Sequence, residues 1–107
     1  MIQARMLFRR RGANVEGLID VIGKRFDITR EEMVGGSQRQ TASNGRSVFC
    51  YLGTRELGLT GRELSWAFGL TPAAIHYAVV RGERSLKENE EVQEALLKDL
   101  TDLTTSP

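Results

Sequence analysis

The stretch LTGRELSWAFGLTPAAIHYAVVRG, residues Leu59–Gly82, has the pattern of a helix-turn-helix and decides the fold that we expect for this chain. Two short helices are expected, joined by a turn at Gly69. Thr60 and Glu63 form a capping-box pattern at the start of the first helix. Gly69 stands where a helix can end in the left-handed conformation, which costs glycine the least.

The second helix is expected to begin at Thr71-Pro72 and to end at Gly82. Thr71 is a good N-cap, and Pro72 suits the first helical position because its missing N–H would be unpaired there anyway. Apolar residues at helical spacing are expected to lock the two helices together: Leu64, Phe68, Leu70, Ile75, Ala78 and Val79. Helix pairs of this size and order are used to place the second helix in the DNA major groove.

Length and composition predict one all-α domain of five to six helices. A chain of 107 residues forms a single core, and β-branched runs are few. One cysteine, Cys50, excludes a disulfide framework and a cysteine-rich zinc site, and fits a reducing cytoplasm. No apolar stretch approaches the ~18 residues of a membrane span, and the first residues do not form a secretory signal. We therefore expect a cytoplasmic protein.

The charges are unevenly distributed along the chain. Residues 1–84 hold thirteen Lys and Arg against eight Asp and Glu, a balance of +5, whereas residues 85–107 have a balance of −4. The formal net charge of +1 therefore combines a basic body with an acidic last helix. This asymmetry is typical of a polyanion-binding body with a solvated tail.

The rest of the chain is expected to supply four more helices and two ends. Residues 1–13 are interpreted as a basic arm or linker remnant, residues 14–100 as the domain, and residues 101–107 as a frayed tail. Thr29 with Glu32, and Ser85 with Glu88, repeat the capping-box pattern. The expected helices are residues 14–26, 30–34 (ended by the glycines at 35 and 36), 45–56 (ended by Gly58) and 85–100, and residues 37–44 are expected to be irregular.

Taken in order, three pieces of the chain carry a family resemblance: FDITREEMVGGSQRQ, GRSVFCYLGTRELGLTGRELSWAFG and AIHYAVVRGE. They make residues Val15–Arg84 resemble the C-terminal DNA-binding domain of the replication initiator DnaA, which has a Trp-repressor-like fold. The chain is still more similar to the C-terminal domain of REP-associated, insertion-sequence-type tyrosine transposases, for which RGERSLKENEEV is an expected ending. The resemblance implies binding to double-stranded or hairpin DNA and a nucleoid-associated location.

The chain departs from the initiator family at its DNA-reading positions. Where that family has the signature Arg-Asp-His-Thr-Thr, this chain has Leu70-Thr71-Pro72-Ala73-Ala74, so the base contacts of that Asp and His do not carry over. The family's basic loop corresponds to residues 37–46, in which only Arg39 and Arg46 are charged. The resemblance therefore implies the fold and general DNA binding, but not the target sequence.

The transposase likeness raises the question of catalysis. Those enzymes need a His-x-His metal pair beside a nucleophilic Tyr. This chain has one histidine, His76, so it cannot form that metal site. We expect a non-enzymatic binding domain with no cofactor, no small-molecule substrate and no membrane partner. The sequence leaves open whether the domain forms a homodimer.

The candidate DNA-binding residues come from the helix-turn-helix, its flanks and the polar loop. Ala73 and Ala74 suit contact with thymine methyl groups, and polar side chains farther along the second helix suit base edges or phosphates. Thr60 and Thr71 begin helices and suit phosphate positioning. The full set is Arg39, Arg46, Thr60, Arg62, Thr71, Ala73, Ala74, His76, Tyr77, Arg81 and Arg84.

Each of these residues also has a plainer interpretation. His76 can be an ordinary surface histidine, and Tyr77 can cover the core with its hydroxyl in water. Arg81 and Arg84 can be charges favoured at a helix C-terminus, while the loop arginines can keep the loop solvated. Trp66 is expected to pack on the core rather than stack on bases, because aromatic side chains mostly supply apolar burial. The arginines at positions 9–11 suit a minor-groove arm or a solvated linker.

Two function classes follow from these residues. The first is a sequence-preferring double-stranded DNA-binding domain. The second is a protein-interaction module, in which Val92, Leu96 and Leu100 of the acidic last helix pair with a partner helix instead of covering the domain's own core. RNA binding has less support, because the sequence does not predict an exposed aromatic platform.

Overall fold

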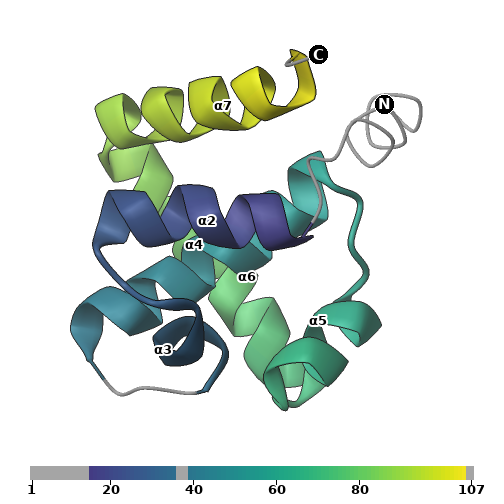
Figure 1. Cartoon of the computed structure of the whole chain (residues 1–107). Coiled ribbons are helices and arrows are strands. Elements are labelled where there is room, and N and C mark those ends of the chain that lie inside the picture. Colours follow the sequence, from purple (N-terminus) through teal and green to yellow (C-terminus); the bar gives the residue numbers. More distant parts are fainter. Residues whose placement is uncertain (1–14, 36–38, 106–107) are drawn as a thin grey trace.

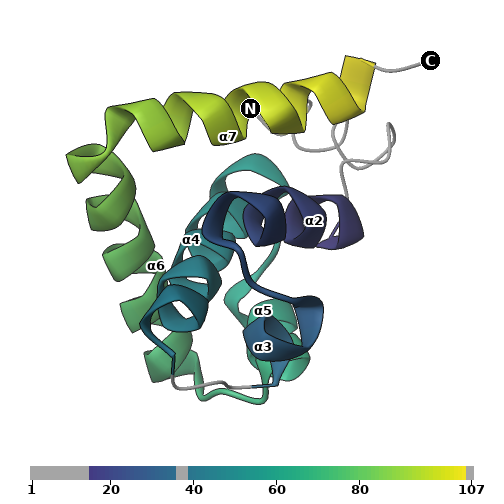
Figure 2. The ribbon, with the colours of Figure 1, turned by 60° about the vertical axis from the view of Figure 1, so that its left-hand side comes forward.

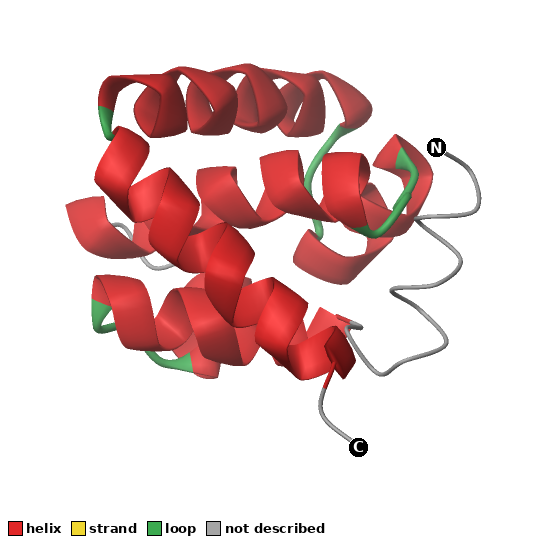
Figure 3. Ribbon diagram, turned by 90° about the horizontal axis from the view of Figure 1, so that it is seen from above, coloured by secondary structure: helices red, strands yellow, loops and turns green. Residues whose placement is uncertain are grey.

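The structure is a computed structural model that describes residues 15–35 and 39–105, and these ranges contain helices and loops but no strand (Figures 1 and 3). The all-α fold class is confirmed. The helices are α2 (Val15–Phe26), α3 (Arg30–Val34), α4 (Gln40–Glu56), α5 (Gly61–Phe68), α6 (Pro72–Glu88) and α7 (Glu90–Thr105). No helix in the described ranges has the length and apolar character needed to cross a membrane.

Helix α4 lies at the centre of the fold. It packs most extensively against α6 and also contacts α2 and α3. Helix α7 lies across α2, at the end of α6 opposite α5 (Figures 1 and 2). Every helix from α2 to α7 turns apolar side chains into one core, whose largest fully buried members are Phe49, Leu18, Ile22, Met33, Leu52, Leu57, Leu64, Leu86, Leu96 and Leu100.

Side-chain caps begin three of the helices as the sequence predicts. Thr29 and Glu32 form a complete capping box at α3. The Thr60 hydroxyl accepts a hydrogen bond from the Glu63 N–H at 3.0 Å, and the Thr71 hydroxyl accepts one from the Ala74 N–H at 3.1 Å. These bonds satisfy backbone donors that have no partner within their own helix.

The turn between α5 and α6 is built as the sequence predicts. Gly69 caps α5 with φ 65°, in the left-handed region. The Leu70 N–H donates to the Ser65 carbonyl oxygen at 3.1 Å, and the Ser65 hydroxyl donates to the Leu70 carbonyl oxygen. Leu64 and Ile75 are buried on either side of this turn. The turn between α5 and α6 therefore rests on a glycine, a pair of reciprocal bonds and a small apolar cluster.

The predicted end of α6 is wrong. The helix does not stop at Gly82 but continues to Glu88, with Asn89 as its C-cap. Gly82 is buried, and a Cβ at this position would lie 2.7 Å from the Ser47 carbonyl carbon and 2.9 Å from the Tyr51 Cβ. Gly82 therefore serves the close crossing of α4 and α6 rather than a helix end.

The helix boundaries that follow Gly82 shift as a consequence. Ser85 and Glu88 do not form a capping box that opens the last helix, because both lie in the last turns of α6. Helix α7 begins at Glu90 instead and extends to Thr105. Residues 101–105, expected to belong to a frayed tail, continue α7, and residues 106 and 107 lie outside the described ranges.

The predicted irregular loop is also partly wrong. Helix α4 begins at Gln40, five residues before its expected start. Ala42 is fully buried and anchors the first turn. The Gln40 side-chain amide donates to the side-chain oxygen Oδ1 of Asn44 at 3.0 Å. This first turn of α4 is difficult to predict from the sequence, because its exposed face is polar and a single buried alanine does not produce a helical periodicity of apolar residues. The expected helix start at Asn14 and the arm at residues 1–13 lie outside the described ranges.

Replacing Gly82 with alanine tests the close helix crossing. Gly82→Ala is expected to destabilise the domain by roughly 3 kcal/mol, because the added methyl group collides with backbone atoms that cannot rotate away. The gain of about 1 kcal/mol in helix propensity does not offset this cost. The measurement is the denaturant concentration at the midpoint of unfolding, monitored by circular dichroism.

Gly61→Ala is the matched control for this experiment. Gly61 is also helical, but a Cβ there would meet nothing within 4 Å. The stability of the Gly61→Ala variant is expected to stay unchanged or to rise slightly. Equal midpoints for the two variants would contradict the packing role of Gly82.

Candidate nucleic-acid interface

One stripe of exposed side chains follows the outer face of α6. Ala73, Tyr77, Val80, Arg84 and Lys87 are spaced three or four residues apart, so they lie on the same side of the helix. All five are exposed, and Tyr77 keeps 72% of its surface accessible. We call these five residues the α6 stripe. It starts with small and aromatic groups near the helix N-terminus and ends with two positive charges.

Acidic residues limit the positive field at the far end of the stripe. Glu83, which is half-buried, and the exposed Glu88 line the same surface hollow as Val80, Arg84 and Lys87. The N-terminal half of α6 has no acidic residue. Positive potential is therefore least opposed along the first three turns of α6, which hold Arg81.

A groove of about 380 Å³ runs beside the stripe, between α4 and the N-terminal half of α6. Small side chains form most of its walls, and Tyr77 and Arg81 supply hydrogen-bonding groups. We call it the α4–α6 groove. Its lining is Ser43, Arg46, Ser47, Leu70, Ala73, Ala74, Tyr77, Ala78 and Arg81. Five predicted DNA-binding residues, Arg46 with Ala73, Ala74, Tyr77 and Arg81, are therefore brought together.

The two arginines predicted from the polar region make contacts within the fold. The half-buried Arg46 donates to the Met33 carbonyl oxygen at 2.7 Å and to the Glu32 carbonyl oxygen at 3.1 Å. These bonds satisfy the last carbonyl groups of α3. Arg39 lies 2.7 Å from the Glu32 carboxylate and donates to the Asp27 carbonyl oxygen at 3.4 Å. Both side chains hold α3 against α4, and Arg46 also brings positive charge to the α4–α6 groove.

The remaining predicted residues are spread over other parts of the surface. Thr60 and Thr71 cap α5 and α6 with their hydroxyl groups. Arg62 lines a different hollow, which contains no α6 residue. His76 is exposed on the edge of α6 opposite Arg81. Arg84 belongs to the α6 stripe.

The prediction that Trp66 packs on the core is wrong. Its side chain is 89% exposed. Helix α5 turns Leu64 and Phe68 inward, where the Phe68 ring meets Phe49 edge to face at 5.3 Å. A residue midway between them lies on the opposite side of a helix. Trp66 and Tyr77 line different hollows, so the two exposed aromatic side chains do not form one stacking platform.

Three polar or charged residues at this interface were not predicted from the sequence to bind DNA. Lys87 extends the α6 stripe, and Ser43 and Ser47 line the α4–α6 groove. The three-residue spacing from Arg84 to Lys87 could have indicated that both lie on one face of a helix. The helix was expected to end at Gly82, so this spacing was not used. Nothing in the sequence around residues 43–47 indicates contact with α6, because that contact is made only in the tertiary fold.

The apolar stripe of α7 faces the domain itself. Leu96 and Leu100 are fully buried, and Val92 and Leu97 pack against the same core. Asp99 lies 3.8 Å from Arg25 of α2. The stripe that a partner helix would need is therefore occupied by this chain's own residues.

The exposed groups of the α6 stripe are small apolar, aromatic and basic side chains. Small apolar, aromatic and basic side chains are the groups that contact thymine methyls, base edges and phosphates in DNA complexes. Among the described residues, no three His, Cys, Asp or Glu side chains are placed to hold a metal ion. No family model, curated protein or solved structure matches this chain significantly. The chemistry of these residues is therefore the ground for assigning a function.

Cys50 is expected to be unreactive in the folded protein. Burial raises the pKa of the thiol from 9.0 to about 12, although the nearby Arg46 charge opposes the shift. The folded state holds the thiol proton more tightly than the unfolded state does. The contribution of this pKa difference to the free energy of unfolding is therefore complete below pH 9 and is lost as the pH rises from 9 toward 12. The measurement is the rate of thiol modification at pH 8, with and without denaturant.

Cys50→Ala provides the control for the pH dependence. Without the thiol, the free energy of unfolding should fall less steeply between pH 9 and 11 than in the unaltered protein. Thiol modification as fast in the folded as in the unfolded protein would contradict the burial of Cys50.

Proposed function

We propose that this domain is a non-enzymatic, sequence-preferring module for double-stranded DNA that places the N-terminal half of α6 in the major groove. The observation that carries the proposal is the α6 stripe beside the α4–α6 groove. Both present DNA-compatible groups on a helix whose opposite face is anchored by Ile75, Gly82 and Leu86. A second helix held in this way after a tight turn is the arrangement that helix-turn-helix proteins use to read bases.

The N-terminal half of α6 has a length close to the width of the DNA major groove. At 1.5 Å per residue, Ala73 to Arg81 spans about 12 Å, which is close to the width of the B-DNA major groove. Ala73 and Ala74 are small enough to approach thymine methyl groups, and Tyr77 and Arg81 are long enough to donate to base edges. The first turns of α6 are therefore proposed to read the sequence.

Arg84 and Lys87 are proposed to contact the phosphate backbone. They lie beyond Arg81 along the helix, so they reach past the major groove toward its flanking phosphates. Further, peripheral contacts are proposed for His76, Thr71, Thr60, Arg62, Arg39 and Arg46. Phosphate contacts position the protein without reading sequence, so these residues are expected to set affinity and salt dependence.

The target is proposed to be a mobile-element or regulatory site rather than a replication origin. The acidic and histidine readers implied by the initiator resemblance are absent from Leu70 to Ala74. The closer likeness to transposase C-terminal domains favours duplex or hairpin DNA at the end of such an element and a nucleoid-associated location. The protein-interaction alternative is less favoured, because Leu96 and Leu100 are buried within the domain.

Titration against DNA at several salt concentrations tests the proposal. Binding to a duplex or hairpin is expected to weaken with a log–log salt slope of about −4 to −5, if ~4–6 phosphates are neutralised. The measurement is fluorescence anisotropy or gel shift, followed by in vitro selection of preferred sites. Absence of binding to either form of DNA at low salt would overturn the proposal.

Arg81→Ala tests sequence reading directly. This variant is expected to lose about 1–3 kcal/mol of binding to the selected site and to discriminate less against other sequences. Lys87→Ala, in contrast, should weaken binding to all sequences alike and reduce the salt slope by about 1. Lys98→Ala on α7 is the charge-matched control and should bind as the unaltered protein does. If Arg81→Ala weakened binding to every sequence equally, Arg81 would have no reading role.

A further inference from the structure

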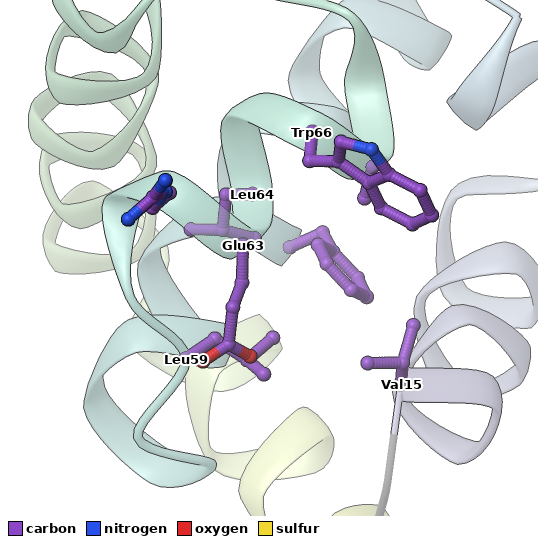
Figure 4. A pocket seen from close by; sticks show the side chains of 8 residues that line it. Val15, Leu59, Glu63, Leu64 and Trp66 are labelled. Carbon is purple, nitrogen blue, oxygen red and sulfur yellow. The ribbon is translucent and has the colours of Figure 1, made fainter.

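An apolar groove beside α5 is not explained by the proposed DNA binding. It has a volume of about 520 Å³ and lies between the start of α2, α4 and α5. Its apolar walls are Val15, Phe49, Leu59, Leu64, Trp66 and Ala67, and Arg62 and Glu63 also line it. Figure 4 shows Trp66 and Val15 on opposite sides of this groove, with Leu59 and Glu63 at its lower edge. We call it the Trp66 groove.

Trp66 makes this groove unusual for the surface of a small domain. Its side chain is 89% exposed, the highest value among the exposed large apolar side chains. An indole typically buries 150–250 Å² when it packs, and open apolar patches mark interaction sites. Phe49 closes the floor of the groove and is almost fully buried. The groove therefore has a buried apolar floor, and the exposed indole of Trp66 can pack on a molecule bound there.

The chain itself is attached at the edge of this groove. Val15 is both the first residue of α2 and part of the groove wall. The described chain therefore begins beside the groove. Phe8 lies seven residues before Val15, so an extended chain reaches up to about 25 Å from it. Such a tether supplies a local concentration in the millimolar range without an intermolecular step.

The preceding sequence contains an apolar run of a suitable size. Met6, Leu7 and Phe8 are consecutive and are followed by Arg9 to Arg11. Methionine adapts to irregular apolar surfaces, and a phenyl ring packs well on an indole. The volume of the groove falls in the range of about 300–1,000 Å³ that holds drug-sized molecules, so it has room for two or three such side chains.

We propose that Met6-Leu7-Phe8 dock in the Trp66 groove and cover Trp66, with Arg9 to Arg11 held at the edge of the groove near Glu63. This docking does not depend on DNA binding. It would anchor the basic arm at a groove that shares no lining residue with the α4–α6 groove. Charge is a secondary contribution, because Arg62 lines the same groove as Glu63.

The single tryptophan of the chain makes the proposal directly measurable. In the full chain without DNA, Trp66 fluorescence is expected to be blue-shifted and poorly quenched by acrylamide. The double substitution Leu7→Ser with Phe8→Ser should shift the emission to the red and raise quenching to the level of N-acetyltryptophanamide. Tyr77→Ala, in the other groove, is the control and should leave the emission unchanged. Circular dichroism confirms that each variant is folded.

Three results would overturn the proposal. Trp66 in the unaltered chain could be quenched as freely as N-acetyltryptophanamide, which would leave the groove open. Protection that is lost on dilution and is insensitive to the double substitution would assign the groove to a second copy of the chain. Protection that is insensitive to both changes would assign it to another occupant. DNA titration of the same variants reports separately on the proposed function.

Discussion

The close crossing of α4 and α6 at Gly82 is the constraint on which the rest of the structure depends. With no Cβ at position 82, the α6 backbone lies against the Ser47 carbonyl group and the Tyr51 side chain. An interior helical glycine costs about 1 kcal/mol in propensity. The contact permitted by the glycine offsets this cost, because α4 and α6 share the most extensive helix–helix interface of the described fold.

This crossing gives α6 two roles on opposite faces. Ile75, Gly82 and Leu86 hold it to the core, so the exposed face is presented on a rigid and continuous helix. The same contact sets how far α6 stands from the first turns of α4, and therefore forms the α4–α6 groove. A helix that ended at Gly82 would have placed Arg84 and Lys87 on a separate element. Because α6 continues to Glu88, Arg84 and Lys87 lie on the same face of the helix as Tyr77.

The two grooves differ in chemistry because α5 and α6 turn different residues outward. The α4–α6 groove combines small side chains with Arg46, Tyr77 and Arg81, whereas the Trp66 groove is lined mainly by carbon. The polar and the apolar lining are therefore separated on the molecule.

The sequence by itself determined the all-α class, the caps at Thr29, Thr60 and Thr71, and the left-handed turn at Gly69. These features depend on interactions between residues that are a few positions apart in the sequence, so a local sequence pattern is enough to predict them. Only the tertiary structure decided the role of Gly82, the exposure of Trp66 and the contacts of Arg46. Glycine suits both a helix end and a close helix crossing, so its role depends on Ser47, which is distant in sequence. Trp66 and Arg46 differ from expectation for the same reason: the packing of neighbouring helices, rather than local propensity, determines which side of α5 faces the core and which carbonyl groups an arginine meets.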